Sequence, residues 1–223
     1  MAEETERSRE FPDRQALEEA LGARCGQEIQ RKLRDSYVAV AGLGGLGSNV
    51  ATALARAGVG RLLLVDFDRV DISNLNRQHY FIKHLGMPKP EALKEQLLQI
   101  NPWMKVETAF VKVTQENIEQ LFQNVQVVCE AFDRAENKAM LVNKVLELFP
   151  QKGLICASGL AGYGRSNQIQ TRKIGRNFYL CGDEVSENLP GMGLWAPRAA
   201  LCAAHQANAV LEFLLGPQDT EIQ

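Results

Sequence analysis

The sequence has few of the features that indicate a membrane protein, a secreted protein or a nucleic-acid-binding protein. No apolar run is long enough to span a bilayer, and the charged N-terminus lacks the apolar core of a signal peptide. Lysine and arginine number 25 against 27 acidic residues, so no strong basic field exists to attract nucleic acid or an anionic membrane. We therefore expect a cytoplasmic protein that binds no membrane, and we do not expect nucleic acid as a partner.

Cysteine is too sparse and too scattered to build a scaffold. The five cysteines are odd in number, far apart in the chain, and include no Cys-x-x-Cys pair. This spacing argues against a disulfide framework and against a four-thiolate zinc site. We expect reduced thiols and no structural zinc. Cys129, Cys156 and Cys202 lie in apolar segments, where cysteine is typical of a packed core.

Short apolar runs alternate with helical stretches along the chain. This alternation predicts an α/β fold of the Rossmann-like kind, a mostly parallel sheet with helices on both faces, plus antiparallel strands near the C-terminal end. The charged residues 1–14 predict a flexible arm, and residues 15–223 a single domain. The predicted strands cover residues 37–41, 61–65, 105–113, 125–130, 153–158 and 168–172. The predicted helices cover residues 15–33 (with a break near Gly22 or Gly26), 48–57, 89–100, 114–123, 134–149 and 197–215.

A glycine-rich turn, residues 42–47, joins the first predicted strand to the next predicted helix. Gly42, Gly44 and Gly45 let the backbone approach a phosphate, and the helix N-terminus offers unpaired N–H groups to it. Asp66 ends the following strand about 20 residues later, where an acidic side chain suits a ribose hydroxyl. A turn needed only for packing and a solvated carboxylate are the alternatives. The two features together predict nucleotide binding but do not separate NAD from ATP.

Polar and cationic residues after the second predicted strand separate the two nucleotides. Arg77 and Lys89 can neutralise phosphate oxygens, and Asn74 can donate a neutral hydrogen bond. A dehydrogenase has no evident use for these groups, whereas a triphosphate does. The segment before Lys89 consists of Ser73, Asn74, Leu75, Asn76, Arg77 and Gln78. The sequence therefore favours ATP.

Asp133 follows another buried strand and precedes a predicted helix. Open α/β sheets bind ligands at the carboxyl ends of their strands, and this position shares that edge with Gly42 and Asp66. A single carboxylate suits Mg²⁺, which keeps most of its waters and also takes phosphate oxygens. The alternative role is a helix N-cap, for which Asp133 is equally well placed.

These motifs together resemble the ubiquitin-activating-type adenylyltransferases, the ThiF/MoeB/HesA family, over about residues 33–216. Segments 157–164, 196–198 and 204–207 resemble most the short, zinc-free ThiF branch linked to thiamine biosynthesis. The resemblance implies a homodimer that uses ATP and Mg²⁺ to adenylylate a ubiquitin-like sulfur carrier protein, ThiS-like, at the glycine carboxylate of its Gly-Gly tail. Two alternatives stay open. One is the tRNA threonylcarbamoyladenosine dehydratase branch, and the other is a non-catalytic module that binds nucleotide and docks a ubiquitin-like protein.

The resemblance also implies roles for individual residues. Asp66 would take the ribose, and Gln78 would line the same pocket. Three residues would carry catalysis, with the last contacting Mg²⁺ through the nucleotide: Arg77, Lys89 and Asp133. The residues around the nucleotide would be Gly42, Gly44, Gly45, Asp66, Ser73, Asn74, Leu75, Asn76, Arg77, Lys89 and Asp133.

Three further expectations concern the partner proteins. Cys181 is expected in a loop after a strand, and some relatives use a cysteine to capture the activated carrier, so it is a possible nucleophile although no basic residue adjoins it. Arg14 resembles an arginine that reaches into the partner subunit's ATP site in relatives, but it lies farther from Gly42 than in that pattern. Residues 159–165, rich in glycine, are expected to line the groove for the carrier tail.

Overall fold

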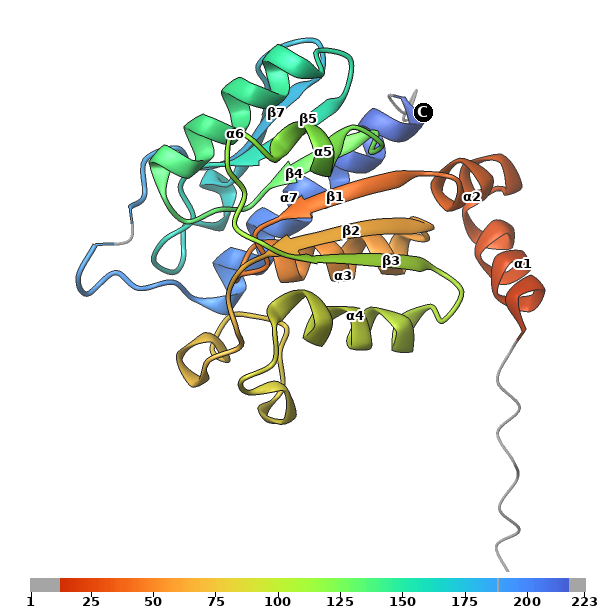
Figure 1. The fold of residues 1–223 in the computed structure, drawn as a ribbon, viewed down its shortest axis with the longest axis horizontal. Helices are drawn as coiled ribbons and strands as arrows, with labels where there is room; N and C mark the ends of the chain where they lie inside the picture. Colours follow the sequence, from red (N-terminus) through yellow and green to blue (C-terminus); the bar gives the residue numbers. More distant parts are fainter. Residues whose placement is uncertain (1–12, 188, 217–223) are drawn as a thin grey trace, which may run out of the picture.

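A mostly parallel β-sheet forms the centre of the computed structural model, which describes residues 13–187 and 189–216 (Figure 1). Within these residues seven strands have the order β3-β2-β1-β4-β5-β7-β6, and β6 runs antiparallel to β7. The predicted Rossmann-like α/β class is confirmed, including the antiparallel pair. Residues 1–12 of the predicted arm lie outside the described residues. The strands are β1 (Tyr37–Ala41), β2 (Arg61–Asp66), β3 (Lys105–Phe110), β4 (Val127–Glu130), β5 (Gly153–Ala157), β6 (Gln170–Lys173) and β7 (Phe178–Gly182).

The central strands are buried on both faces, which explains their continuous apolar sequence. Every residue of β1, β4 and β5 is buried, whereas all four residues of the edge strand β6 are exposed. Side chains of one strand point alternately to opposite faces. In β1, Val38 and Val40 accordingly join one apolar layer, while Ala39 and Ala41 join the other.

Helices cover both of these layers (Figure 1). On one face lie α3 (Gly47–Ala57), α4 (Lys89–Ile100) and the long α7 (Ala196–Leu215), whose buried side chains include Leu54, Leu93 and Val210. On the other face lie α5 (Ile118–Phe122) and α6 (Ala135–Leu148), which bury Phe122 and Leu141. None of the described helices combines the length and the apolar character that crossing a membrane requires.

The N-terminal helices α1 (Arg14–Cys25) and α2 (Gln27–Arg34) lie near the amino ends of the strands (Figure 1). They are separated at Gly26, whose φ of 91° is one that glycine adopts easily, so the predicted break falls there. Arg14 is the first residue of α1, and its Nε lies 2.7 Å from Oε1 of Glu18. Together with Gly60 and Asn101 it lines a small cavity of about 50 Å³.

The C-terminal part differs from the sequence prediction. The prediction placed residues 179–183 in a loop, but β7 (Phe178–Gly182) enters the sheet between β5 and β6. The apolar run 178–181 has only four residues and is followed by Gly182, so the sequence alone does not distinguish a strand from a loop. The predicted strand 168–172 begins later, since residues Ser166–Gln168 form a short 3₁₀ helix, η3.

Candidate nucleotide-binding site

The site lies where three neighbouring parallel strands end. Ala41 at the end of β1 is in register with Val65 of β2 on one side and with Glu130 of β4 on the other. The backbone continues these ladders beyond the strands. Gly42 donates its N–H to the carbonyl of Val65 at 2.8 Å, and Ala131 donates to the carbonyl of Ala41 at 2.8 Å. The loops after β1, β2 and β4 therefore start side by side, as the sequence predicted.

The glycines of the turn have different roles. A Cβ on Gly47 would lie 1.8 Å from the carbonyl oxygen of Gly42, and a Cβ on Gly42 would lie 2.7 Å from that of Ala131. Both glycines are thus required by the fold itself. A Cβ on Gly44 would meet its nearest neighbour, Nε2 of Gln78, only at 3.8 Å, so the fold alone does not require glycine there. This difference suits a turn whose tip is kept clear for a ligand.

The Asp66 carboxylate binds the backbone of the glycine turn. Its Oδ2 accepts the N–H of Leu43 at 2.6 Å, and its Oδ1 accepts the N–H of Asp68 at 2.8 Å. The residue is only 8% exposed. Burial raises the pKa of Asp66, against the positive charge of Lys89, which acts to lower it. Each carboxylate oxygen has two lone pairs, so both oxygens keep acceptor capacity for hydroxyl groups.

Lys89 is held beside this carboxylate by backbone pairing. Its N–H donates to the carbonyl of Asp68 at 3.0 Å, and Val70 donates likewise to Met87 at 2.9 Å. The Lys89 side chain is buried, and its Nζ lies 2.8 Å from Oδ2 of Asp68. An ammonium group has three donors, and Asp68 takes one of them within the described residues. The remaining donors are free to bind anionic oxygens.

Arg77 lies against the glycine turn. A Cβ on Gly45 would be 3.1 Å from Cγ of Arg77, and the Nη1 atom donates to the carbonyl of Ser73 at 3.1 Å and to Oδ1 of Asn76 at 2.8 Å. Asn74 has a local role, because its side chain and that of Asp71 form the capping box of η1 (Ile72–Asn74). Arg77 is thus in contact with Ser73 and Asn76, whereas the Asn74 side chain caps the short helix η1.

Gln78 is a buried amide next to the turn. Its Oε1 has no hydrogen-bond partner among the described residues, and the residue is 9% exposed. The segment that carries it is anchored to the turn on both sides. Ser48 Oγ accepts the N–H of His79 at 3.1 Å, and the hydroxyl of Tyr80 donates to the carbonyl of Leu43 at 2.9 Å. An unpaired buried acceptor at this place indicates a donor that the chain does not supply.

Asp133 lies exposed in the loop between β4 and α6. No hydrogen bond to its carboxylate occurs within the described residues, and Arg134, not Asp133, occupies the N-cap position of α6, without a capping side chain. The preceding residue is close to the turn, since a Cβ on Gly42 would lie 3.1 Å from the ring of Phe132. Across the described residues no group of three His, Cys, Asp or Glu side chains forms a metal site. A lone available carboxylate fits an ion whose other ligands are water and phosphate.

An ion pair between a buried carboxylate and a half-buried lysine, close in sequence to Asp133, was not predicted from the sequence. Glu130 is 1% exposed, and its two oxygens lie 2.9 and 3.1 Å from Nζ of Lys138, which also donates to the carbonyl of Ala157 at 3.0 Å. Glu130 Oε1 accepts the N–H of Phe132 at 2.7 Å. Burial raises the pKa of Glu130, and the Lys138 charge opposes this. The available signal was an acidic residue that closes an otherwise apolar strand.

Cys181 does not lie in an exposed loop, and that expectation was wrong. It belongs to β7, is 0% exposed, and its sulfur lies 3.7 Å from the hydroxyl of Thr171. Burial raises the pKa of this thiol to about 11, although the Thr171 contact acts against the rise. A nucleophilic cysteine needs exposure and a lowered pKa. The position provides neither of them.

The sheet order, the glycine turn and the acid that ends β2 define a Rossmann-like α/β domain. The ThiF family model matches residues 17–223, and the chain belongs to the ThiF family. One relative is the sulfur carrier protein ThiS adenylyltransferase of Escherichia coli, 31% identical over 192 residues, which cover 84% of this chain and 75% of the relative.

Other relatives carry different names. The tRNA threonylcarbamoyladenosine dehydratase of Bacillus subtilis is 43% identical over 124 residues, or 55% of this chain. The match spans only about half of that protein (49%). An Escherichia coli tRNA threonylcarbamoyladenosine dehydratase, solved in complex with ATP, shares the fold with a TM-score of 0.80 at 23% identity, over 88% of this chain and 92% of that one. These names come from two branches of the family, so membership alone does not assign the substrate.

Proposed function

We propose that this protein adenylylates the C-terminal glycine carboxylate of a ubiquitin-like sulfur carrier protein, with ATP as the second substrate. The observation that carries the proposal is that cationic side chains lie close to the glycine turn, whose Gly44 has no close neighbour. Arg77 packs against Gly45, and Lys89 reaches the Asp68 carboxylate from the start of α4. Both lie at the carboxyl edge of the sheet, together with Asp66.

Each side chain has a role that its contacts support. Asp66 accepts the ribose hydroxyls, and the buried Gln78 amide lines the same pocket. Arg77 and Lys89 hold the phosphate oxygens. Asp133 would hold Mg²⁺, and the bound ion would screen phosphate charge. Ser73 and Asn76 contribute through their contacts with Arg77, whereas Asn74 and Leu75 support the turn that carries them.

The chemistry needs positioned charge more than acid–base groups. A carboxylate oxygen of the carrier attacks the α-phosphorus, the bond from that phosphorus to the bridging oxygen breaks, and pyrophosphate leaves with the electron pair. The carrier then bears an acyl-adenylate, whose carbonyl is open to attack by sulfur. The protein contributes orientation and neutralised phosphate charge, which are the main terms in phosphoryl-type transfer.

A surface suited to the carrier lies next to the site. Gly162 donates its N–H to the carbonyl of Gly193 at 2.9 Å, which brings segment 159–165 against segment 189–195. Large apolar side chains stand exposed on these segments, with Tyr163 82% and Trp195 51% exposed. We place the groove for the Gly-Gly tail along segment 159–165, and we expect the working enzyme to be a homodimer.

A ThiS-like carrier of thiamine thiazole biosynthesis is the proposed partner. The Escherichia coli relative named as a ThiS adenylyltransferase aligns over three quarters of its own length (75%). The Bacillus subtilis dehydratase aligns over 49% of its length. The dehydratase reading keeps a specific argument in its favour, since its identity of 43% is higher over the shorter match. The formal charge of −2 gives no basic excess for binding tRNA.

Mass spectrometry of the carrier after incubation with the protein and Mg-ATP tests the proposal. We expect a mass increase of one adenylyl group on a ThiS-like carrier that ends in Gly-Gly, and none on a carrier shortened by its last glycine. Pyrophosphate exchange into ATP should require the same carrier. Filter binding of tRNA, with ATP-dependent change of the modified base and no carrier adduct, would support the dehydratase function instead.

A further inference from the structure

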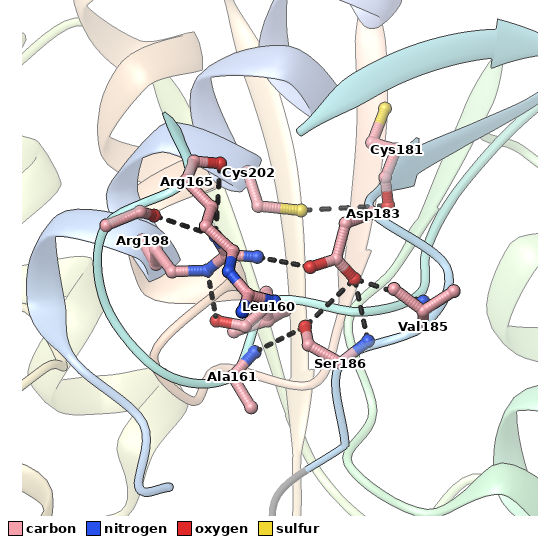
Figure 2. Close-up of polar contacts among 10 residues, drawn as sticks. Leu160, Ala161, Arg165, Cys181, Asp183, Val185, Ser186, Arg198 and Cys202 are labelled. Carbon is pink, nitrogen blue, oxygen red and sulfur yellow. Dashed lines mark hydrogen bonds and ion pairs between the residues drawn. The ribbon is translucent and has the colours of Figure 1, made fainter. Parts of the chain in front are cut away.

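A buried ion pair lies outside the nucleotide site, between the start of α7 and the loop that follows β7 (Figure 2). Asp183 comes directly after β7, and Arg198 lies in the first turn of α7. The Nη2 atom of Arg198 donates to Oδ2 of Asp183, and both side chains are only 4% exposed. Removing two charges from water costs several kcal/mol per ion, so such a pair adds little net stability. We therefore expect the pair to determine the conformation of the surrounding loops more than the stability of the fold.

Arg198 holds the loop after β5. Its Nη1 donates to the carbonyl oxygens of Gly164 at 2.9 Å and Arg165 at 3.3 Å, and its Nε donates to that of Leu160 at 3.4 Å (Figure 2). Three carbonyls from one loop thus meet a single guanidinium group. Only the planar, forked donor set of arginine can serve these carbonyls and a carboxylate at the same time.

Asp183 holds the loop after β7 in the same way. Its Oδ1 accepts the N–H groups of Val185 at 3.1 Å and Ser186 at 2.8 Å, and the Ser186 hydroxyl at 2.9 Å (Figure 2). The Ser186 hydroxyl oxygen in turn accepts the N–H of Ala161 at 3.1 Å. The carboxylate therefore organises one loop and, through Ser186, ties it to the other.

The backbone of the two loops is fitted to this arrangement. Asp183 donates its N–H to the carbonyl of Gly159 at 2.9 Å, and Glu184 donates to Ser158 at 3.0 Å. Gly159 has a φ of 77°, and a Cβ there would lie 2.1 Å from Oδ1 of Asp183. Any side chain at Gly159 would displace the carboxylate. The two loops and the ion pair are therefore one packed unit.

A chain of hydrogen bonds leads from this unit to the phosphate-binding segment. Gly162 binds the carbonyl of Gly193 at 2.9 Å, as described above. The next carbonyl, that of Leu194, accepts from Nδ2 of Asn76 at 3.3 Å. Asn76 then accepts from Arg77 at 2.8 Å through its Oδ1. The loop held by Arg198 is thus connected, contact by contact, to the guanidinium group of Arg77, a residue whose Cγ lies against the glycine turn.

We propose that Asp183 and Arg198 form a positioning pair for the adenylylation reaction. The pair fixes segment 159–165 against segment 189–195 and the Arg77 segment, so that an extended peptide tail lying on segment 159–165 points its carboxylate at the α-phosphate. Neither residue touches the reacting atoms. This inference rests on the proposed function. It adds that the position of the carrier tail depends on the Asp183–Arg198 pair, whereas the affinity for ATP does not.

Two conservative variants test the pair. Arg198→Lys keeps the positive charge but loses the planar set of guanidinium donors. Asp183→Asn keeps the shape of the side chain but loses its negative charge. The matched control is Arg61→Lys, because Arg61 pairs with Glu107 at 2.6 Å between β2 and β3, away from these loops. We expect kcat/KM for the carrier to fall about 10²-fold in both test variants, the loss typical of a misplaced reactant. The Kd for ATP, measured without carrier, should not change, and the control should match the wild type.

A second readout follows the loops directly. Hydrogen exchange of the full chain should become faster in segments 160–165 and 189–195 of Arg198→Lys, with β1 and β4 unchanged. Wild-type exchange in those segments together with wild-type kcat/KM would overturn the positioning role. An equal loss of ATP affinity and carrier turnover would also overturn it, as the sign of a general structural defect.

If the wild-type protein adenylylates no carrier, the proposed function fails, and the positioning role fails with it. If Arg198→Lys does not fold, Asp183→Asn supplies the same comparison.

Discussion

Oδ2 of Asp66 lies 2.6 Å from the backbone nitrogen of Leu43, so the acid that ends β2 also fastens the glycine turn that follows β1. The same carboxylate fixes the start of the next loop through the N–H of Asp68. A ribose bound by Asp66, as we propose, would therefore be positioned relative to the turn by a single side chain. This double role makes Asp66 sensitive to both protonation and substitution.

The buried carboxylate should give the stability of the protein a characteristic pH dependence. Burial raises the pKa of Asp66 above its ordinary value of 3.8, so the folded chain binds this proton more tightly than the unfolded chain. The contribution of Asp66 to the free energy of unfolding is then present below pH 3.8 and is lost as pH rises through the folded-state pKa. Urea denaturation of wild type and Asp66→Asn across this range measures it.

The variant serves as the reference, because asparagine does not titrate. We expect the wild-type free energy of unfolding, minus that of Asp66→Asn, to decrease as pH rises from about 4 and then to level off. A difference that grows with pH would mean that the positive charge of Lys89 outweighs burial, and that the folded-state pKa of Asp66 is lowered.

Two glycines of one turn should separate ligand binding from folding. Gly44→Ala fits the free protein, since its Cβ would have 3.8 Å of clearance, and we expect an unchanged Tm with ATP affinity reduced on the order of tenfold, about 1.4 kcal/mol. Gly47→Ala would set a Cβ 1.8 Å from a carbonyl oxygen, and we expect it to cost about 3 kcal/mol of stability. Thermal denaturation and calorimetric titration with ATP measure both. Normal ATP affinity in Gly44→Ala would show that no phosphate approaches the tip of the turn.

Local signals made much of this fold and part of this site predictable. The helix predicted over residues 89–100 has those same ends, because Pro88 precedes it and Asn101 and Pro102 follow it. Strand ends gather at one edge of a parallel sheet, so Gly42 and Asp66 were expected to meet, and they do. Such inferences need only the order of the elements.

The features that the sequence did not reveal depend on contacts between distant segments. Asp183 and Arg198 are 15 residues apart and meet only because β7 enters the sheet between β5 and β6. Cys181 was interpreted as a loop residue because that strand was not foreseen. The capping contact between Asn74 and Asp71 in η1 was not predicted, whereas the phosphate contact of Asn74 stays a prediction. Neither the sheet order nor this capping contact can be deduced from residue spacing alone.

Removing the proposed phosphate-binding groups should reduce the proposed adenylylation without unfolding the protein. Arg77→Ala, Lys89→Ala and Asp133→Ala should each lower the rate about 10²–10³-fold, the usual cost of losing one electrostatic stabiliser. Lys83→Ala is the matched control, since Lys83 is more than half exposed (55%) and pairs with Glu95 on the surface. Pyrophosphate exchange measures the rates, and circular dichroism checks the fold. Wild-type rates in all three variants would place the site elsewhere.

Cys181 should behave as a structural residue. Among the five cysteines, Cys25 is exposed and the other four are buried. A thiol reagent should therefore modify one cysteine rapidly in the native protein and all five after unfolding. Cys181→Ala should keep carrier adenylation and sulfur loading at the wild-type rate, with Cys25→Ala as the control that removes the rapid reaction. Loss of sulfur loading in Cys181→Ala alone, with adenylation intact, would restore Cys181 as a nucleophile.

The Glu130–Lys138 pair should show strong coupling because its carboxylate is buried, although Lys138 is 25% exposed. Lys138→Met leaves Glu130, which is 1% exposed, without its cation, and we expect a loss of about 3 kcal/mol in the free energy of unfolding. The double variant Glu130→Gln/Lys138→Met removes both charges and should be more stable than the Lys138→Met single variant. Urea denaturation of the full cycle measures the coupling. The pair Lys144 and Glu147, whose carboxylate is 65% exposed, provides the control, with an expected coupling of about 0.5 kcal/mol. Additive effects in the first cycle would mean that water reaches Glu130 at the end of β4, and that the loop leading to Asp133 is not held by this pair.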